Sequence, residues 1–213
     1  MSPLLPQRPF LYAIVDVAFL RGRAVGKVVA ELVRGGTGLL QIRAKETPDA
    51  LFVEMAREAL AAARSGGVPL LVNDRADIAR IVGADGVHVG QEDLRPAIVR
   101  RLLAPGAIIG VSTHSVEQVE AAGVEPVDYI AVGPVFPTRS KKRVDPVVGL
   151  DLIRQAKQIT PFPVVAIGGI GPANVGEVVS AGADGIATIS ALSAPADLHM
   201  AAAELKAALL ASR

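Results

Sequence analysis

The sequence predicts a (β/α)8 TIM barrel, and three features of the chain support that prediction. Short aliphatic runs alternate with longer amphipathic segments along the whole of the 213 residues. Eight such pairs fit into this length, which is the unit count of the barrel. An open doubly wound sheet usually has five or six strands and would leave units over. No linker or change of composition divides the chain, so we expect one domain over residues 1–213, with residues 1–9 as an N-terminal extension.

The expected strands are aliphatic runs, because the strands of a parallel sheet are buried on both faces. They cover Leu11–Val15, Gly38–Ile42, Pro69–Val72, Gly86–Val89, Ala107–Val111, Tyr129–Val132, Val164–Ile167 and Gly185–Ile189. The longer segments between them are amphipathic and are expected to be helices. They cover Ala24–Arg34, Pro48–Arg64, Ala76–Val82, Leu94–Leu103, Ser115–Ala122, Leu150–Ile159, Ala173–Ala181 and Pro195–Leu210.

A faint internal repeat supports this order. The sequence Gly-Ala-Asp-Gly followed by Val or Ile stands at 83–87 and again at 182–186, each time at a helix-to-strand junction. Its first glycine can end a helix, and its Asp-Gly pair can turn the chain into the next strand. Looser versions stand at 36–39 and 123–130, so the copies precede the second, fourth, sixth and eighth strands, which predicts a duplicated βαβα unit. Asp85 and Asp184 lie at strand beginnings and are therefore assigned to the turns and not to the chemistry.

Composition excludes several classes of protein. Acidic and basic residues are interspersed and the net charge is +1, so neither nucleic acid nor a membrane is an expected partner. The chain has no cysteine, which excludes disulfides and fits a reducing cytoplasm. Met1–Pro9 lacks the apolar core of a signal peptide. Glycines and prolines interrupt the longest uncharged run, Ile159–Gly176, which argues against a membrane helix. We expect a soluble, cytoplasmic protein.

Two neighbouring strands are expected to deliver acidic and amide side chains to one point. Asn73 and Asp74 directly follow the third expected strand, and Gln91 and Asp93 follow the fourth. Parallel strands joined by a crossover helix place both clusters at the same end of the sheet. Magnesium typically takes one or two protein carboxylates, with phosphate oxygens and waters as its other ligands. The pattern indicates half of a metal–diphosphate site; the alternative is that both aspartates are ordinary loop residues.

A phosphate site is predicted after the seventh and eighth strands, where many barrels have one. Gly168 and Gly169, followed by Pro172 at a plausible helix start, offer unhindered backbone N–H groups. Ile189 and Ser190 end the eighth strand beside them. The alternative is that the two glycines only allow a tight turn.

Basic side chains lie across the predicted mouth from this phosphate site. Arg43 and Lys45 alternate along the second strand, so their side chains leave on the same side and suit neutralisation of a diphosphate. The loop 133–148 is unusually long and carries Thr138, Ser140 and Lys141, which is typical of a lid or a binding loop. The alternative for this loop is a solvated basic segment.

The residues at the strand ends resemble thiamine-phosphate synthase. The matching motifs occur in the family's order over almost the whole chain: Gln41-Ile-Arg-Ala-Lys45, Val72-Asn-Asp-Arg75, Gly86-Val-His-Val-Gly-Gln-Glu-Asp93, Gly110-Val-Ser-Thr-His-Ser115, Gly133-Pro-Val-Phe-Pro-Thr-Arg-Ser-Lys-Lys142, Ile167-Gly-Gly-Ile170 and Ile189-Ser190. The resemblance implies a TIM barrel that joins a hydroxymethylpyrimidine diphosphate to a thiazole phosphate with Mg²⁺ and releases diphosphate. It also implies a dissociative mechanism, in which diphosphate leaves before the thiazole nitrogen captures a pyrimidine-methyl cation.

Residue roles follow from the resemblance, motif by motif. The pyrimidine diphosphate is expected to bind to Gln41, Ile42, Arg43, Ala44, Lys45, Asn73, Ser112 and Lys141. The thiazole phosphate is expected to bind to Thr138, Arg139, Ser140, Gly169, Ile189 and Ser190. The expected Mg²⁺ ligands are Asp74 and Asp93, and the expected catalytic residues are Arg43, Lys141 and Ser112. The chain departs from the family pattern at Ala44, where glutamate is common, and at Ser140, where threonine is common.

Two alternative functions remain open at this stage. The related thiazole tautomerase uses a histidine in the loop after the fifth strand, and His114 stands there; the tautomerase, however, needs no diphosphate site. A non-catalytic thiamine-phosphate sensor would have lost the metal ligands, which this chain retains. His88, inside a strand, is assigned to packing or hydrogen bonding between loops. Related barrels often dimerise, so a homodimer is one possible assembly.

Overall fold

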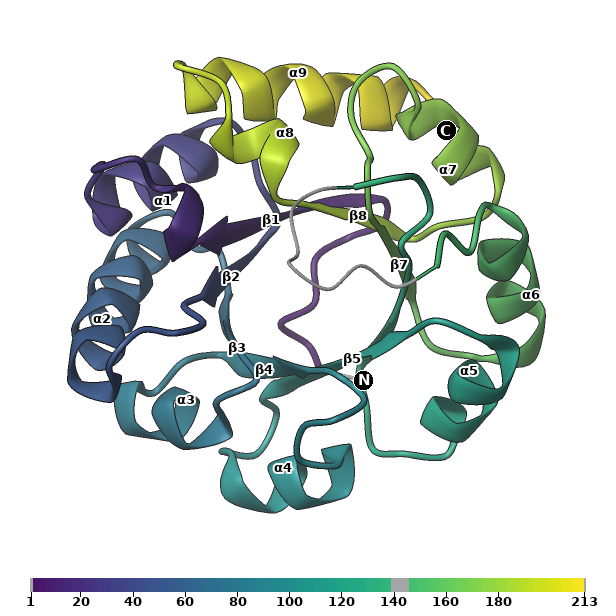
Figure 1. The fold of residues 1–213 in the computed structure, drawn as a ribbon, viewed down its shortest axis with the longest axis horizontal. Coiled ribbons are helices and arrows are strands. Elements are labelled where there is room, and N and C mark those ends of the chain that lie inside the picture. Colours follow the sequence, from purple (N-terminus) through teal and green to yellow (C-terminus); the bar gives the residue numbers. More distant parts are fainter. Residues whose placement is uncertain (1, 139–145, 213) are drawn as a thin grey trace.

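The strands form a closed parallel barrel in the order β1 to β8 in the computed structural model, which describes residues 2–138 and 146–212 (Figure 1). Each strand pairs with its sequence neighbours, and β1 closes the ring by pairing Phe10 with Gly185 of β8. The strands are β1 Phe10–Asp16, β2 Leu39–Arg43, β3 Leu70–Asn73, β4 Gly86–Val89, β5 Ile108–Thr113, β6 Tyr129–Val132, β7 Val164–Ile167 and β8 Gly185–Thr188. The predicted (β/α)8 TIM barrel is confirmed.

Helices surround the barrel and cover its outer face (Figure 1). They are α1 Val25–Arg34, α2 Asp49–Ser65, α3 Ala76–Val82, α4 Pro96–Leu102, α5 Val116–Gly123, α6 Asp151–Ile159, α7 Val175–Ser180, α8 Ser190–Ser193 and α9 Leu198–Ala211, with a 3-10 helix η1 at Val17–Phe19. The sequence did not predict η1 or α8, because elements this short carry no helical periodicity. Pro172 does not open α7, which begins three residues later at Val175.

The aspartates at the strand beginnings hold neighbouring strands together. Asp85 accepts a hydrogen bond from the backbone N–H of Leu70 at 2.9 Å, and Asp184 accepts one from Val164 at 2.8 Å. Asp128, before β6, does the same with the backbone N–H of Ile109 at 2.9 Å. The repeated bond explains the sequence repeat and confirms that Asp85 and Asp184 lie away from the carboxyl ends of the strands.

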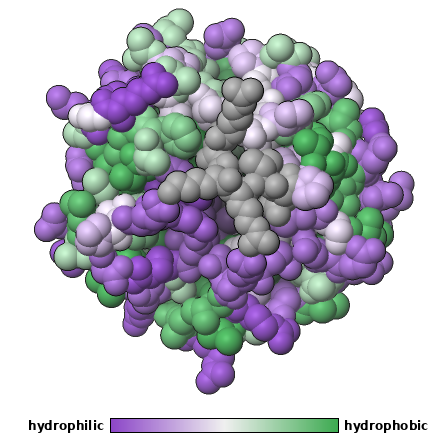
Figure 2. All heavy atoms as spheres, viewed as in Figure 1, coloured by the Kyte–Doolittle hydropathy of each residue, from purple (hydrophilic) through white to green (hydrophobic). Residues whose placement is uncertain are grey.

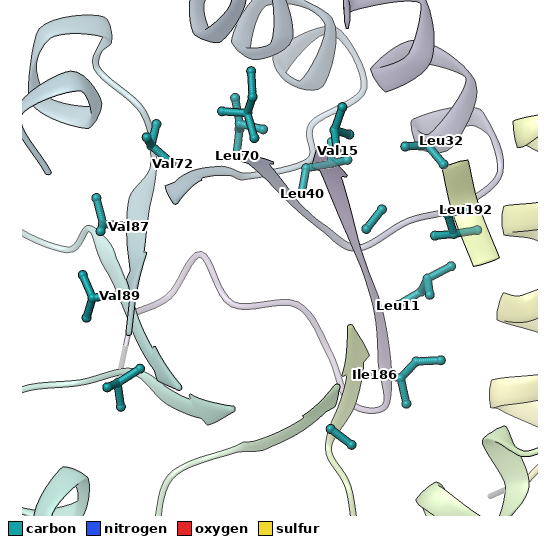
Figure 3. Close-up of a cluster of buried hydrophobic side chains, with 14 of the residues drawn as sticks. Leu11, Val15, Leu32, Leu40, Leu70, Val72, Val87, Val89, Ile186 and Leu192 are labelled. Atoms are coloured by element: carbon teal, nitrogen blue, oxygen red, sulfur yellow. The ribbon is translucent and has the colours of Figure 1, made fainter. Parts of the chain in front are cut away.

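The hydrophobic core has two layers, because successive side chains of a strand point to opposite faces. The outer layer lies between the strands and the helices, where Leu11, Val15, Leu40 and Val72 point toward the helical ring (Figure 3). The inner layer fills the barrel and contains Phe10, Tyr12, Ile14, Leu39, Leu71, Ile108, Tyr129, Ala131, Val165, Ala187 and Ile189. The barrel is therefore a packed core and not a pore.

The N-terminal segment is tied to the end of the barrel where the strands begin. The backbone N–H of Ser2 donates to Asp128 Oδ1 at 2.5 Å, and its hydroxyl donates to the carbonyl of Gly106 at 2.6 Å. Leu5 packs against the inner layer of the core. These contacts keep the segment away from the opposite end, where the strands deliver their polar side chains. Within the described ranges, no helix is both long enough and apolar enough to cross a bilayer.

Candidate active site

The predicted site residues that the structure describes lie on β2 to β8 or in the loops after these strands. Hydrophilic surface gathers around this mouth of the barrel on the side of β2, β3 and β4 (Figure 2). The described members of the predicted set are Gln41, Ile42, Arg43, Ala44, Lys45, Asn73, Asp74, Asp93, Ser112, Thr138, Gly169, Ile189 and Ser190. Arg139, Ser140 and Lys141 lie outside the described residues.

Arg43, the last residue of β2, forms an ion pair with Asp16, the last residue of β1. The Asp16 side chain is only 2% exposed, and its other oxygen accepts a hydrogen bond from the backbone N–H of Ala18 at 3.0 Å. The carboxylate thus fixes the guanidinium at the mouth. The sequence prediction missed Asp16, although it follows an aliphatic run as directly as Asn73 does.

Asp74 and Asp93 face one another, although they come from different strands. Burial is the largest cause that raises the pKa of Asp74, followed by the hydrogen bond and the charge of Asp93. Lys45 opposes this shift, because its Nζ lies 3.3 Å from Asp74 Oδ2. The two carboxylates repel one another at a partly buried point. A cation bound between them would offset this repulsion, so the pair suits a metal ion.

The backbone around both aspartates is fixed. Asp74 has a positive φ of 62°, a left-handed conformation that aspartate tolerates better than most residues. Its N–H donates to the carbonyl of His88 on β4 at 2.8 Å. Asp93 Oδ2 accepts a hydrogen bond from the N–H of Gly90 at 2.7 Å, which ties the loop after β4 to its own strand. Hydrogen-bonded turns therefore place the two carboxylates.

These residues fit a magnesium ion better than a transition metal. Among the described residues no cluster of three or more His, Cys, Asp or Glu side chains could hold a metal. Magnesium needs no such cluster, because substrate phosphate and water commonly complete its coordination. The oxygen donors of Asp74 and Asp93, together with the basic side chain of Lys45, suit a magnesium–diphosphate group.

A pocket opens on the other side of the mouth. Residues from β5 to β8 and their loops line it: Ser112, His114, Ala131, Gly133, Pro134, Thr138, Ile167, Gly168, Gly169, Ala187, Thr188, Ile189 and Ser190. It brings together every described residue that was predicted to hold the thiazole phosphate. His114 also lines it, with its Nδ1 2.5 Å from the carbonyl oxygen of Gly133.

Two glycines allow the loop after β6 to pack against the loop after β7. Gly168 has a φ of +104°, and a Cβ on it would lie 2.6 Å from Pro134 Cα. Gly169 has a φ of +65°, and a Cβ on it would lie 2.6 Å from the carbonyl oxygen of Pro137. A hydrogen bond of 3.0 Å from the N–H of Phe136 to the carbonyl of Gly168 stabilises this close approach.

Substitution of Gly168 by alanine is expected to lower the free energy of unfolding by about 3 kcal/mol, because left-handed strain and overpacking act together. Urea unfolding measures this loss. Gly171→Ala is the matched control, because its Cβ would meet no atom within 4 Å and its φ is not positive. Equal stability of the two variants would show that the packing of the two loops does not depend on Gly168.

Two members of the predicted set face away from the mouth. The side chains of Ile42 and Ala44 are buried in the outer layer of the core. Only their backbone atoms are available to a bound molecule at the mouth. The alternation along β2 explains this, because Gln41 and Arg43 point the other way.

Polar residues inside the barrel form a chain that the sequence analysis did not detect. Gln41 bonds to Tyr12, Tyr12 to Tyr129, Tyr129 to His88, and His88 Nε2 lies 2.8 Å from Ser112 Oγ. The sequence assigned His88 to packing or to hydrogen bonding between loops. Its ring does stack on Tyr129, but its hydrogen-bond partners lie on the strands β6 and β5 and not in loops. The two tyrosines gave no signal, because in aliphatic strands they are indistinguishable from ordinary core residues.

Comparisons with known proteins point to one family. A family model described as thiamine monophosphate synthase matches residues 11–192. Thiamine-phosphate synthase of Chloroflexus aurantiacus is 42% identical over 197 residues, which cover 92% of this chain and 91% of that protein. The protein of the same name from Shouchella clausii is 44% identical over 203 residues, 95% of this chain and 97% of that protein. The solved structure of thiamine phosphate pyrophosphorylase from Pyrococcus furiosus matches with a TM-score of 0.85 at 34% identity, over 95% of this chain and 96% of that one.

Proposed function

The chain belongs to the thiamine monophosphate synthase family, and from this membership we propose how its barrel mouth performs the reaction. It is a transferase with thiamine-phosphate synthase activity. We propose that its substrates are a pyrimidine with a diphosphate on its methyl carbon and a thiazole phosphate. One carbon–oxygen bond of the pyrimidine breaks, diphosphate leaves with the electron pair, and the thiazole nitrogen forms the new bond to that carbon.

The observation that carries this proposal is the division of the mouth into a charged region and a separate pocket. The acidic and basic residues after β2, β3 and β4 suit a diphosphate with its metal, and the cavity beside β7 and β8 suits a single phosphate on a small ring. Both regions open at the same end of one barrel. A bisubstrate transfer needs this arrangement, because the two reacting atoms must meet between the two phosphate groups.

In the diphosphate region, Arg43 and Lys45 neutralise the leaving group, and Asn73 donates its amide. Asp16 keeps the Arg43 guanidinium in place, so little reorganisation is needed when charge grows on the departing oxygen. Lys141, proposed from the sequence alone, adds a further cation from the loop after β6. Cations that act on developing charge stabilise the transition state more than the bound substrate.

Asp74 and Asp93 would hold Mg²⁺. Magnesium, when bound, supplies positive charge to the diphosphate and so makes it a better leaving group. Ser112 contacts the pyrimidine ring from β5. No residue has to remove a proton from the thiazole nitrogen, which attacks with its own lone pair.

In the cavity, Gly169, Ile189 and Ser190 offer backbone N–H groups and one hydroxyl to the thiazole phosphate. Thr138 lines the same cavity. Arg139 and Ser140 are proposed from the sequence to add to this set. The apolar walls formed by Ala131, Ile167 and Ala187 suit the ring.

The tautomerase alternative does not survive the comparisons, because the full-length relatives are synthases. His114 keeps a contact with the Gly133 carbonyl through Nδ1, which suits a residue that shapes the cavity wall. The sensor alternative is disfavoured by the retained pair Asp74 and Asp93. We further propose a single-domain cytoplasmic enzyme that works on small molecules, with a homodimer as its possible assembly.

Ser190→Ala is expected to raise the KM for thiazole phosphate about tenfold through the loss of one charge-assisted hydrogen bond, and to leave the KM for the pyrimidine diphosphate within about twofold. Steady-state kinetics with each substrate varied in turn measure this. Ser193→Ala, on the same short helix but not in the cavity lining, is the matched control. Equal increases in both KM values would argue against two separate anion regions.

The function itself is tested by product analysis. Purified protein with both substrates and Mg²⁺ is expected to form thiamine phosphate, and His114→Ala is expected to keep more than about a tenth of the activity if the residue only lines the cavity. Isomerisation of the thiazole without condensation, abolished in His114→Ala, would instead support the tautomerase.

A further inference from the structure

Five polar side chains form one hydrogen-bonded chain through the barrel interior to the mouth. Gln41 Nε2 lies 2.5 Å from the hydroxyl of Tyr12, which lies 3.0 Å from that of Tyr129. The Tyr129 hydroxyl lies 2.7 Å from His88 Nδ1, and His88 Nε2 lies 2.8 Å from Ser112 Oγ. The chain thus crosses from β2 to β5 and ends at the residue proposed to contact the pyrimidine.

The inner members of this chain are closed off from water. Tyr12 and Gln41 are 1% exposed, and Tyr129 is fully buried. Burial is the largest cause that raises the pKa of both phenols above its ordinary value. Each tyrosine therefore carries one hydroxyl proton at neutral pH, which it can donate only once.

The number of protons that each side chain can donate sets the direction of the hydrogen bonds among these five residues. The amide nitrogen of Gln41 can only donate, so Tyr12 accepts from it. Either phenol could donate in the bond between Tyr12 and Tyr129, but the buried Tyr12 proton is paired only if Tyr12 gives it to Tyr129. Tyr129 has then accepted from Tyr12 and gives its proton to His88 Nδ1. His88 with an acceptor at Nδ1 is the neutral tautomer that carries its proton on Nε2, and it donates to Ser112 Oγ.

We propose that this chain sets the hydroxyl of Ser112 as a hydrogen-bond donor toward the mouth, with His88 as the positioning residue that acts through it. The Ser112 oxygen already accepts from His88, so its own proton is left for a ligand. The matching group on a ligand is an acceptor without a proton, such as a ring nitrogen of a pyrimidine. This inference rests on the proposed function, in which Ser112 contacts the pyrimidine.

The direction matters because a serine hydroxyl alone rotates to suit its neighbour and discriminates little. If Ser112 gave its proton to His88, it could only accept from the substrate, and a ring nitrogen would meet a lone pair. A site built to donate to a ring nitrogen rejects an analogue that has a C–H group there, because the buried donor is left unpaired.

The tautomer of His88 in the free protein is the first test. Long-range ¹⁵N–¹H correlation spectra of labelled protein separate the two tautomers, and His88→Gln assigns the signal among the three histidines of the chain. The expected result is a neutral ring with its proton on Nε2. A proton on Nδ1, or on both nitrogens at neutral pH, would overturn the proposal. Because no substrate is present, this outcome is independent of whether the protein makes thiamine phosphate.

Kinetics with substrate analogues are the second test. His88→Phe is expected to raise the KM for the pyrimidine diphosphate about tenfold. His88→Gln should keep most of the wild-type affinity for this substrate, because the glutamine amide can still donate to Ser112. The KM for thiazole phosphate should not change. An analogue with C–H in place of the ring nitrogen should bind about tenfold more weakly to the wild type and lose little further in His88→Phe.

Thr113→Val is the matched control, because Thr113 is buried beside Ser112 and donates its hydroxyl to the Ala131 carbonyl at 3.0 Å, outside the chain. It should leave the discrimination between the two pyrimidines unchanged. The proposal would be contradicted if His88→Phe lost equal affinity for the pyrimidine diphosphate and for its C–H analogue. It would also be contradicted if His88→Gln bound the pyrimidine diphosphate as weakly as His88→Phe. If His88→Phe does not fold, the tautomer of the wild type still decides the matter.

Discussion

Asp93→Asn is expected to lower kcat/KM about a thousandfold and to raise the Mg²⁺ concentration for half-maximal rate at least about tenfold. The substitution removes one of the two carboxylates that face one another at the mouth but leaves an oxygen for the hydrogen bond from Gly90. Loss of the charge weakens the site for a divalent cation, and the leaving diphosphate loses its counter-charge. Initial rates over a Mg²⁺ titration measure both effects.

Glu92→Gln is the matched control for Asp93→Asn. Glu92 is the exposed neighbour of Asp93, and its substitution changes the net charge by the same amount. It should leave the Mg²⁺ dependence within about twofold, as expected for a screened surface charge. An Asp93→Asn enzyme with the Mg²⁺ dependence of the wild type would remove Asp93 from the set of metal ligands.

Arg43→Ala is expected to lower kcat about a hundredfold or more and to destabilise the fold by about 3 kcal/mol. The first effect follows from the loss of a cation beside the leaving group. The second follows because the carboxylate of Asp16, whose side chain is 2% exposed, is left without its partner. Turnover with saturating substrates and urea unfolding measure the two effects separately.

Two further variants separate the roles of the Arg43 ion pair. The double variant Asp16→Asn with Arg43→Gln removes both charges, so it should recover most of the stability while turnover stays low. Arg154→Ala breaks an exposed pair with Asp151 and should cost less than about 1 kcal/mol. Recovery of turnover in the double variant would show that Arg43 does not act on the leaving group.

The fold could be predicted because its signals are local. Each aliphatic run is long enough to be recognised as a buried strand, and the spacing of the runs sets the number of units. The ends of the elements moved by a few residues at most, as with α9, which begins at Leu198 and not at Pro195. Helix α8 is four residues long and gave no periodic signal.

The candidate site could be predicted only in part, because contacts between strands depend on geometry that one sequence does not display. The convergence of Asp74 and Asp93 followed from the rule that parallel strands end together. No such rule predicted that Asp16 is the partner of Arg43, because nothing in the sequence links the two residues. The hydrogen-bonded chain inside the barrel was hidden for another reason. In an aliphatic strand Tyr12 and Tyr129 resemble ordinary core residues, and their hydroxyls form a network only because the two side chains face one another.

Diphosphate release is the most direct test of the proposed chemistry. The assay contains purified protein, the pyrimidine diphosphate, the thiazole phosphate and Mg²⁺, and each component is omitted in turn. Two anion regions at one mouth predict release only when all are present, with thiamine phosphate formed in equal amount. Release without the thiazole phosphate would mean hydrolysis and not transfer, and no release from the complete mixture would contradict the account of the diphosphate region.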